Sequence, residues 1–218
     1  MSVTATLFDL CGGHPALDFV NSLDNRFRED GPNEMLASYP DLLRFLQESG
    51  LLSRQRAQAL SKGITSEAAQ RVLRSTRELR ESAAAVLYGT VEGSRPAQAD
   101  LRVLEKYFLE AERHQELQWA AASPASQPAA GQPAAAHAAL KWSWGRFETE
   151  PDLPVWLLAR SLSELLLSDQ AAQVRECAVH TCRWLFLDTS KNHSRRWCNM
   201  KVCGNRMKAR RFQARREI

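Results

Sequence analysis

Four cysteines near the C-terminus have the spacing of a metal-binding site. They follow the pattern C-x4-C-x15-C-x4-C and are Cys177, Cys182, Cys198 and Cys203. Zn²⁺ prefers four thiolates in a tetrahedron, and two close pairs separated by a loop of about 15–20 residues can supply them. Because all four positions are cysteine and none is left for water, we expect one structural zinc ion. Unrelated buried thiols and a redox-active dithiol or disulfide pair remain alternatives.

The second pair of cysteines fits the start of a helix. With Asn199 as the N-cap, Cys198 and Cys203 take the N′ and N4 positions, which meet as in a hydrophobic staple. The first pair is expected in a turn before the alternating run from Trp184 to Leu187. Turn ligands, a hairpin and two ligands at a helix start together predict a small treble-clef-like zinc finger, made of a β-hairpin and a basic helix.

Positive charge is concentrated in the same segment. Residues 175–218 contain 12 basic and 3 acidic side chains, a formal charge of +9, whereas the other 174 residues carry −5. A compact basic segment indicates a polyanionic partner. Because Trp197 and Phe212 are isolated rather than interleaved with the basic residues, duplex DNA is favoured over a single strand. An acidic protein, a membrane surface or no partner at all are the alternatives.

The expected DNA-contacting residues lie in a loop and in the final helix. A regular helix turns by about 100° per residue, and four basic residues then share a stripe about 80° wide that can follow a phosphate backbone. These four are Lys201, Lys208, Arg211 and Arg215. The full set of expected contacts is Arg195, Arg196, Lys201, Arg206, Lys208, Arg210, Arg211 and Arg215.

Polar residues also gather near the N-terminus. Cys11, His14, Asp18, Asn21 and Asp24 could form a Cys–His or acid–base site, but their spacing matches no catalytic motif. We therefore assign no catalytic residue and expect no enzyme. His14, Asp18 and Asn21 are candidates for lining a small-molecule pocket. The alternative is a local structural hydrogen bond between His14 and Asp18.

Helical periodicity dominates the rest of the chain. The expected helices run from Tyr39 to Gly50, from Ser53 to Gly63, from Ser66 onward, from Ala97 to Gln115 and from Leu153 to Leu167. Residues 7–21 are expected to be irregular or short-strand structure that leads into the first helix. Alternation in residues 117–119 and 140–144 predicts the two strands of a hairpin.

The segment between these two strands has a different composition. Residues 120–139 contain 11 Ala and 3 Pro, with no charge and no large side chain to bury. Such a segment cannot offset the entropy lost on ordering, so we expect a disordered insertion at the hairpin tip. A linker between domains is the rival interpretation.

Composition sets the class of protein. The chain has 44% hydrophobic and 25% charged residues, as in soluble proteins of one or two domains. No run of 18 apolar residues and no secretory signal occurs, so we expect a cytoplasmic protein without a membrane partner. The expected fold is a mainly α N-terminal domain with a short β-hairpin in residues 1–170, followed by the zinc finger in residues 171–218.

Two stretches of the sequence resemble known domain families. Residues 197–206, WCNMKVCGNR, resemble the CGNR zinc finger, and residues 13–21, GHPALDFVN, are similar to the start of the ABATE domain. The resemblance implies a bacterial stress-induced transcription regulator whose finger binds zinc and DNA. It also implies that the four cysteines are the zinc ligands, and that Arg206 either contacts DNA or holds the zinc knuckle through backbone carbonyls.

These observations lead to a functional hypothesis with two parts. The basic zinc finger is expected to dock on duplex DNA, and the helical body to sense a small-molecule effector or to form a homodimer. The alternative is a small-molecule-binding or protein-interaction module whose zinc finger is purely structural.

Overall fold

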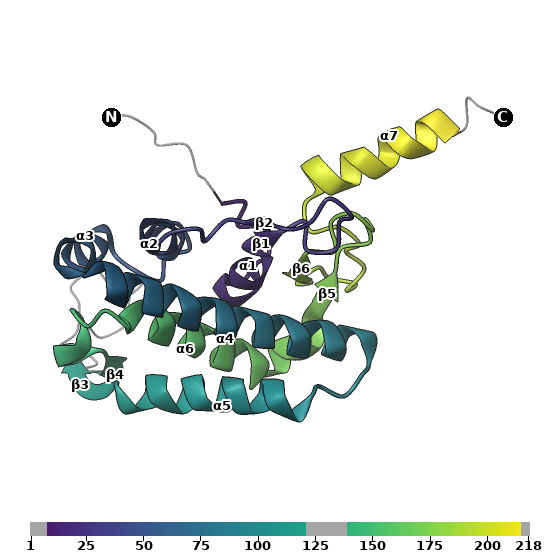
Figure 1. Cartoon of the computed structure of the whole chain (residues 1–218). Helices are drawn as coiled ribbons and strands as arrows, with labels where there is room; N and C mark the ends of the chain where they lie inside the picture. The colour runs from purple at the N-terminus through teal and green to yellow at the C-terminus, as the bar shows by residue number, and fades with distance from the viewer. Residues whose placement is uncertain (1–7, 121–138, 215–218) are drawn as a thin grey trace, which may run out of the picture.

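The C-terminal segment is mounted on a body of packed helices (Figure 1). The computed structural model describes residues 8–120 and 139–214. In chain order its elements are α1 (Pro15–Asn21), β1 (Leu23–Asp24), β2 (Asn33–Glu34), α2 (Tyr39–Glu48), α3 (Arg54–Gly63), α4 (Ser66–Glu92), α5 (Gln98–Arg113), β3 (Glu116–Ala120), β4 (Ala139–Ser143), the 3₁₀ turn η1 (Gly145–Phe147), α6 (Leu153–Leu166), the 3₁₀ turn η2 (Asp169–Gln173), β5 (Val174–Glu176), β6 (Leu185–Leu187), the π-helical turn η3 (Met200–Gly204) and α7 (Asn205–Ala214). The expected fold class is confirmed, because helices dominate and the strands form small antiparallel pairs.

Capping side chains mark the starts of α3 and α4. Ser53 accepts a hydrogen bond from the backbone N–H of Arg56 (3.3 Å) and begins α3. Thr65 accepts one from Ala68 (3.2 Å) and begins α4, which ends at Gly93 with a φ of 74° that suits glycine. The helices expected from residue 39 onward are confirmed to within about two residues at each end.

The N-terminal segment departs from the expectation. Residues 15–21 form helix α1 rather than irregular or short-strand structure. His14 supplies the N-cap through Nδ1, which accepts from the backbone N–H of Ala16 (3.2 Å), and Pro15 fits the first turn because that turn needs no N–H from it. Histidine is a less common cap than Ser, Thr, Asp or Asn, and the local helix signal is therefore weak.

Apolar burial holds the body together. α4, α5 and α6 lie side by side, and α1 packs on α4 and α6 (Figure 1). Leu79 of α4 and Leu158 and Leu162 of α6 are completely buried at the centre of this arrangement. Burying one side chain of this size stabilises a fold by about 1.5–3 kcal/mol. The three helices therefore form the rigid base on which the other elements are placed.

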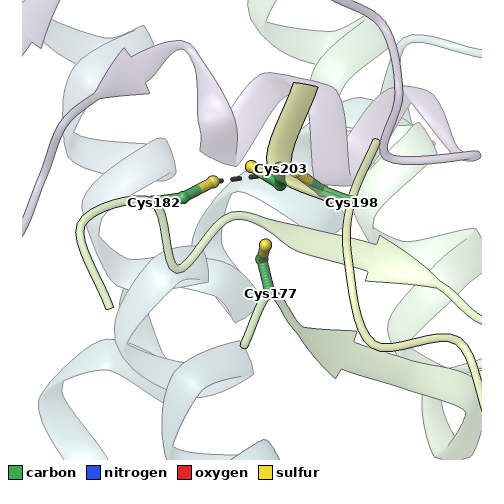
Figure 2. Close-up of side chains that lie close together, drawn as sticks. All are labelled: Cys177, Cys182, Cys198 and Cys203. Atoms are coloured by element: carbon green, nitrogen blue, oxygen red, sulfur yellow. Dashed lines mark hydrogen bonds between the residues drawn. The ribbon is translucent and has the colours of Figure 1, made fainter. Parts of the chain in front are cut away.

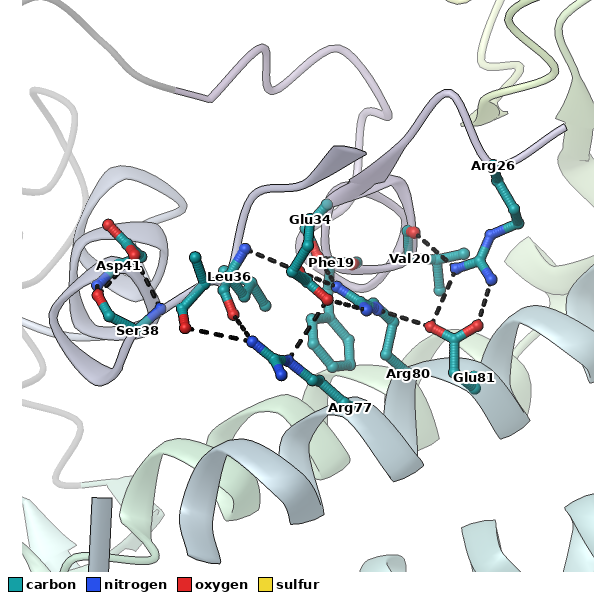
Figure 3. Close-up of polar contacts among 12 residues, drawn as sticks. Phe19, Val20, Arg26, Glu34, Leu36, Ser38, Asp41, Arg77, Arg80 and Glu81 are labelled. Carbon is teal, nitrogen blue, oxygen red and sulfur yellow. Dashed lines mark hydrogen bonds and ion pairs between the residues drawn. The ribbon is translucent and has the colours of Figure 1, made fainter. Parts of the chain in front are cut away.

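A buried arginine fastens β1 and β2 to α4 (Figure 3). Arg80 is 2% exposed and forms a bidentate pair with Glu34 of β2, with N···O distances of 2.6 and 2.7 Å. Arg80 also contacts Glu81 (2.9 Å), which pairs in turn with Arg26 from the loop after β1. Removing one partner of a buried ion pair costs about 3–5 kcal/mol, so this network fixes the loop on the body.

The hairpin expected around residues 117–144 is confirmed. β3 pairs with β4, with Leu117 opposite Trp142 and Trp119 opposite Leu140. These four side chains share one face of the hairpin and are 57–71% exposed. Residues 121–138, where we expected the disordered insertion, lie outside the described residues.

Candidate metal centre and nucleic-acid interface

The four cysteines of the C-terminal segment converge on one point (Figure 2). The sulfur atoms of Cys177, Cys182, Cys198 and Cys203 all lie within 4.8 Å of one another. The Sγ–Sγ distance is 3.6 Å between Cys182 and Cys198 and 3.7 Å between Cys198 and Cys203. Four thiolates at about 2.3 Å from a central Zn²⁺ would lie about 3.8 Å apart. The cluster therefore has the dimensions of a tetrahedral zinc site, and its cysteines are free of disulfides.

The first pair of ligands lies in the connection between β5 and β6. Cys177 directly follows β5, and its backbone N–H donates to the carbonyl of Trp184 (2.9 Å). The Cys182 N–H donates to the Val179 carbonyl (2.8 Å), and the turn continues through Arg183 with a φ of 54°. The expected ligand turn is confirmed, and β5 is the strand that completes its hairpin.

The second pair is held by the π-helical turn η3. Asn199 caps this turn: its Oδ1 accepts a backbone N–H two residues further on (2.9 Å), and its carbonyl accepts from Gly204 (3.1 Å). A hydrogen bond from residue i+5 to residue i brings Cys198 and Cys203, which are five positions apart, to the same side of the chain. A Cβ at Gly204 would overlap the sulfur of Met200, so a larger residue there would require that exposed side chain to move. The expected cap is thus confirmed, although the first turn is π-helical.

This π-helical turn corrects the expected basic stripe. Lys201 lies in η3, and α7 begins only at Asn205, so a constant rotation per residue does not relate Lys201 to Lys208. The premise of one regular helix from Lys201 onward is therefore wrong. Arg211 belongs to α7, whereas Arg215 lies outside the described residues.

Close packing of the thiols opposes their joint ionisation. Hydrogen bonds from the Cys182 and Cys198 thiols lower the pKa of Cys177, and the same contact with Cys177 raises the pKa of Cys182. Burial raises the pKa of Cys203. A divalent cation at the centre of the cluster would stabilise all four thiolates together. The donor set and its geometry therefore fit a structural zinc ion, which supplies a cross-link between the β5–β6 turn and the start of α7.

A buried carboxylate organises the loop between the two ligand pairs. Asp188 accepts from the backbone N–H of Ser190 (3.0 Å), from its hydroxyl (2.5 Å) and from the backbone N–H of Arg195 (3.0 Å). The Ser190 hydrogen bonds hold the pKa of Asp188 below its ordinary value. Sequence reasoning missed Asp188, although the pattern Asp-x-Ser is typical of an Asx turn and could have indicated it.

Arg195 is fully occupied by this part of the structure. Its guanidinium lies over the Phe186 ring, 4.4 Å from the centroid. Its hydrogen-bond acceptors are the backbone carbonyls of Cys11, Leu187, Trp197 and Cys198. The resemblance offered this carbonyl-bridging role to Arg206, but Arg195 performs it. Arg206 is exposed and has no hydrogen bond or ion pair to any residue that the structure describes.

The other basic residues expected to contact DNA are at the surface. α7 extends from the cysteine cluster away from the helical body (Figure 1). The exposed residues of the expected set are Arg196, Lys201, Arg206, Lys208 and Arg210. Within residues 8–120 and 139–214, none of these five side chains forms an ion pair with an acidic group.

The three N-terminal pocket candidates are engaged with the backbone. His14 caps α1, and burial lowers its pKa. The Asp18 carboxylate accepts from the Gly12 N–H (2.7 Å), and burial raises the pKa of Asp18 to about 7. The Asn21 amide donates to the carbonyl of Leu185 and accepts from its N–H, both at 2.9 Å. Each of the three side chains therefore has a hydrogen-bond partner in the backbone. None of them lines the large apolar groove between α4, α5 and β5. A ligand pocket at these residues stays a prediction.

The same region attaches the C-terminal segment to the body. Besides the Asn21–Leu185 contact, hydrogen bonds join Leu187 to the Gly12 carbonyl (2.7 Å), Trp184 to Asp24 (2.9 Å) and the Tyr88 hydroxyl to the Arg183 carbonyl (2.9 Å). No local sequence signal indicates these pairs, because their members lie far apart along the chain. The cysteine cluster is consequently built on the body and does not hang from a free linker.

The fold and the cysteine cluster define a helical protein with a structural zinc module at its C-terminal end. Residues 13–169 match the family model ABATE, described as "Putative stress-induced transcription regulator", and residues 173–216 match zf-CGNR, the CGNR zinc finger. Because the first match spans well over half of the chain, the chain belongs to the ABATE family. It carries one structural zinc ion on the four cysteines.

Neither matched family is described as an enzyme. No curated protein matches the chain. Among the helices that the structure describes, none has both the length and the apolar composition needed to cross a bilayer.

Proposed function

We propose that the protein regulates transcription by binding duplex DNA through α7, with zinc fixing the base of that helix. The observation that carries the proposal is the placement of α7, a basic helix that begins at the cysteine cluster and extends beyond the body (Figure 1). Membership of a regulator family and the +9 charge of residues 175–218 support it.

The exposed cations on and beside α7 would provide the contacts to DNA. Lys208 and Arg210 lie on α7, Arg206 lies at its start, and Arg196 and Lys201 flank the cysteine cluster. Because none of them has an acidic partner among the described residues, each is available to neutralise a phosphate. Arg195 contributes indirectly, since its carbonyl contacts hold the loop that carries Arg196.

In this proposal residues 1–170 form the regulatory body and residues 171–218 the DNA-binding module. Such a regulator would bind DNA in the cytoplasm, and binding DNA requires no catalytic residue. A homodimer would present two copies of α7 to one duplex, and light scattering of the zinc-loaded protein tests for it directly.

Titration of a labelled duplex at several salt concentrations tests DNA binding. Affinity should fall steeply as salt rises, with a slope of about −0.9 per phosphate contact in log–log form. Lys208→Gln and Arg210→Gln should each weaken binding and reduce the slope by about one contact. Arg102→Gln is the matched control, because Arg102 is an exposed arginine of α5 on the body. Binding that is insensitive to salt, or unchanged in both α7 variants, would contradict the proposal.

A further inference from the structure

An apolar groove lies between the helical body and the strand that leads into the cysteine cluster. It has a volume of about 880 Å³ and is bordered by α4, α5, the end of α6, η2 and β5. Cavities that bind small molecules measure about 300–1,000 Å³ and are lined mainly by apolar side chains with a few polar groups. The size and lining of this groove match that description.

Within the part of the chain that the structure describes, the walls of the groove expose apolar side chains to solvent. Leu104 is buried in the groove, Leu101 and Leu109 of α5 are 36% and 46% exposed, and Leu167 at the end of α6 is 82% exposed. Phe108 adds an aromatic ring from α5. Covering such surface gains about 25 cal/mol for each Å² removed from water, so the groove favours an occupant with an apolar body.

The charges of the groove indicate the polar end of that occupant. Glu105 and Glu112 both line it, seven residues apart on α5 and therefore on one face of that helix. Both are exposed, and neither forms an ion pair with any residue described in the structure. The groove also contains Arg175, whose guanidinium donates to the carbonyls of Ala172 (2.8 Å) and Val174 (2.9 Å) and so stays at the β5 end.

We infer that this groove binds an organic cation with an apolar body, its charge placed near Glu105 and Glu112. An apolar occupant covers the exposed leucines, and a cation pairs with two carboxylates that have no basic partner among the described residues. A second copy of this chain could also cover the groove, but two such carboxylates on an apolar wall favour a small cation.

The position of β5 connects the groove to the zinc module, and this second part of the inference rests on the proposed function. Val174 of β5 is buried and lines the groove, and Cys177 follows the same strand. Val174 also pairs with Leu187 of β6, whose N–H donates to the Gly12 carbonyl. A ligand in the groove thus touches the strand that positions the first zinc ligand. We expect occupancy to change the affinity of α7 for DNA.

Calorimetry with two ions of equal shape and opposite charge tests the groove itself. The zinc-loaded full-length protein should bind tetraphenylphosphonium at least about tenfold more tightly than tetraphenylborate. Glu105→Gln and Glu112→Gln should each weaken cation binding about threefold to tenfold, and Leu109→Gln should weaken the binding of both ions. Glu110→Gln is the control on the same helix, because Glu110 does not line the groove and its charge interacts electrostatically with Arg71 instead.

The outcomes separate the groove from the proposed function. Equal affinity for both ions, or cation binding that is unchanged in both groove variants, overturns the cation site. A dimer that buries Leu109 and excludes both ions overturns it as well. Cation binding without any change in duplex affinity overturns only the coupling through β5. A protein that binds the cation but no DNA refutes the proposed function and leaves the groove assignment standing.

Discussion

Replacing Asn21 with alanine tests the contact that joins α1 to the zinc module. The Asn21 amide forms two hydrogen bonds of 2.9 Å with the backbone N–H and carbonyl of Leu185. The two residues are 4% and 0% exposed, so water does not readily replace the amide. A buried donor or acceptor left without a partner costs about 1–3 kcal/mol, and two such groups give an expected loss of about 2–6 kcal/mol. That loss is large beside the roughly 5–15 kcal/mol that stabilise a typical domain.

Urea denaturation followed by far-UV circular dichroism, with zinc in excess, measures this loss. The midpoint should fall strongly for Asn21→Ala. Asn33→Ala is the control, because Asn33 is an exposed asparagine of β2, and its stability should stay within about 0.5 kcal/mol of the parent. Asn21→Asp should also lose stability, since its second carboxylate oxygen would face the Leu185 carbonyl. A value for Asn21→Ala within about 0.5 kcal/mol of the parent would refute the reasoning.

Three further predictions concern the metal, pH and the loop. Cys203→Ser should lower the zinc content from about one ion per chain and unfold the module, as measured by metal analysis and tryptophan fluorescence, whereas Cys11→Ser should keep its zinc. Asp18 has an ordinary pKa of 3.8 and a folded-state pKa of about 7, so its unfolded form releases the proton first and stability falls as pH rises between these values. Asp18→Asn should therefore gain up to about 4 kcal/mol over the parent above pH 7 and little at pH 4, as shown by urea midpoints at both pH values. Arg195→Ala should lower the free energy of unfolding by about 2–4 kcal/mol and release zinc more readily to a chelator. Arg196→Ala, at the exposed neighbouring position, is the control and should match the parent in both measurements.

Local patterns in the sequence were sufficient to predict the positions of most helices and the identity of the zinc ligands. A capping serine such as Ser53 acts within one turn, and the spacing of two cysteine pairs restricts the metal site before any fold is known. α1 was missed because His14 is an uncommon cap. The π-helical turn was missed because a capping asparagine such as Asn199 is equally compatible with an ordinary α-helical first turn.

Contacts between distant segments could not be read from the sequence. Asn21 looked like a candidate ligand-binding residue, and in the structure its partner is a backbone group 164 positions away. Arg195 looked like one of several cations for DNA, yet four carbonyls occupy it. The apolar groove combines residues of three α-helices, a 3₁₀ turn and one strand, and no single element indicates it by its own pattern.

The hydrogen bond from Leu187 to Gly12 sets an order of events for the growing chain. Gly12 leaves the ribosome before Leu187 is made, so this contact can close only once the second residue has been synthesised. The residues of α1 are therefore present before the segment that carries the four cysteines. A C-terminal fragment produced alone would lack Gly12 and Asn21, which form hydrogen bonds to Leu187 and Leu185. We therefore expect the zinc module to be less stable when it is separated from the N-terminal residues.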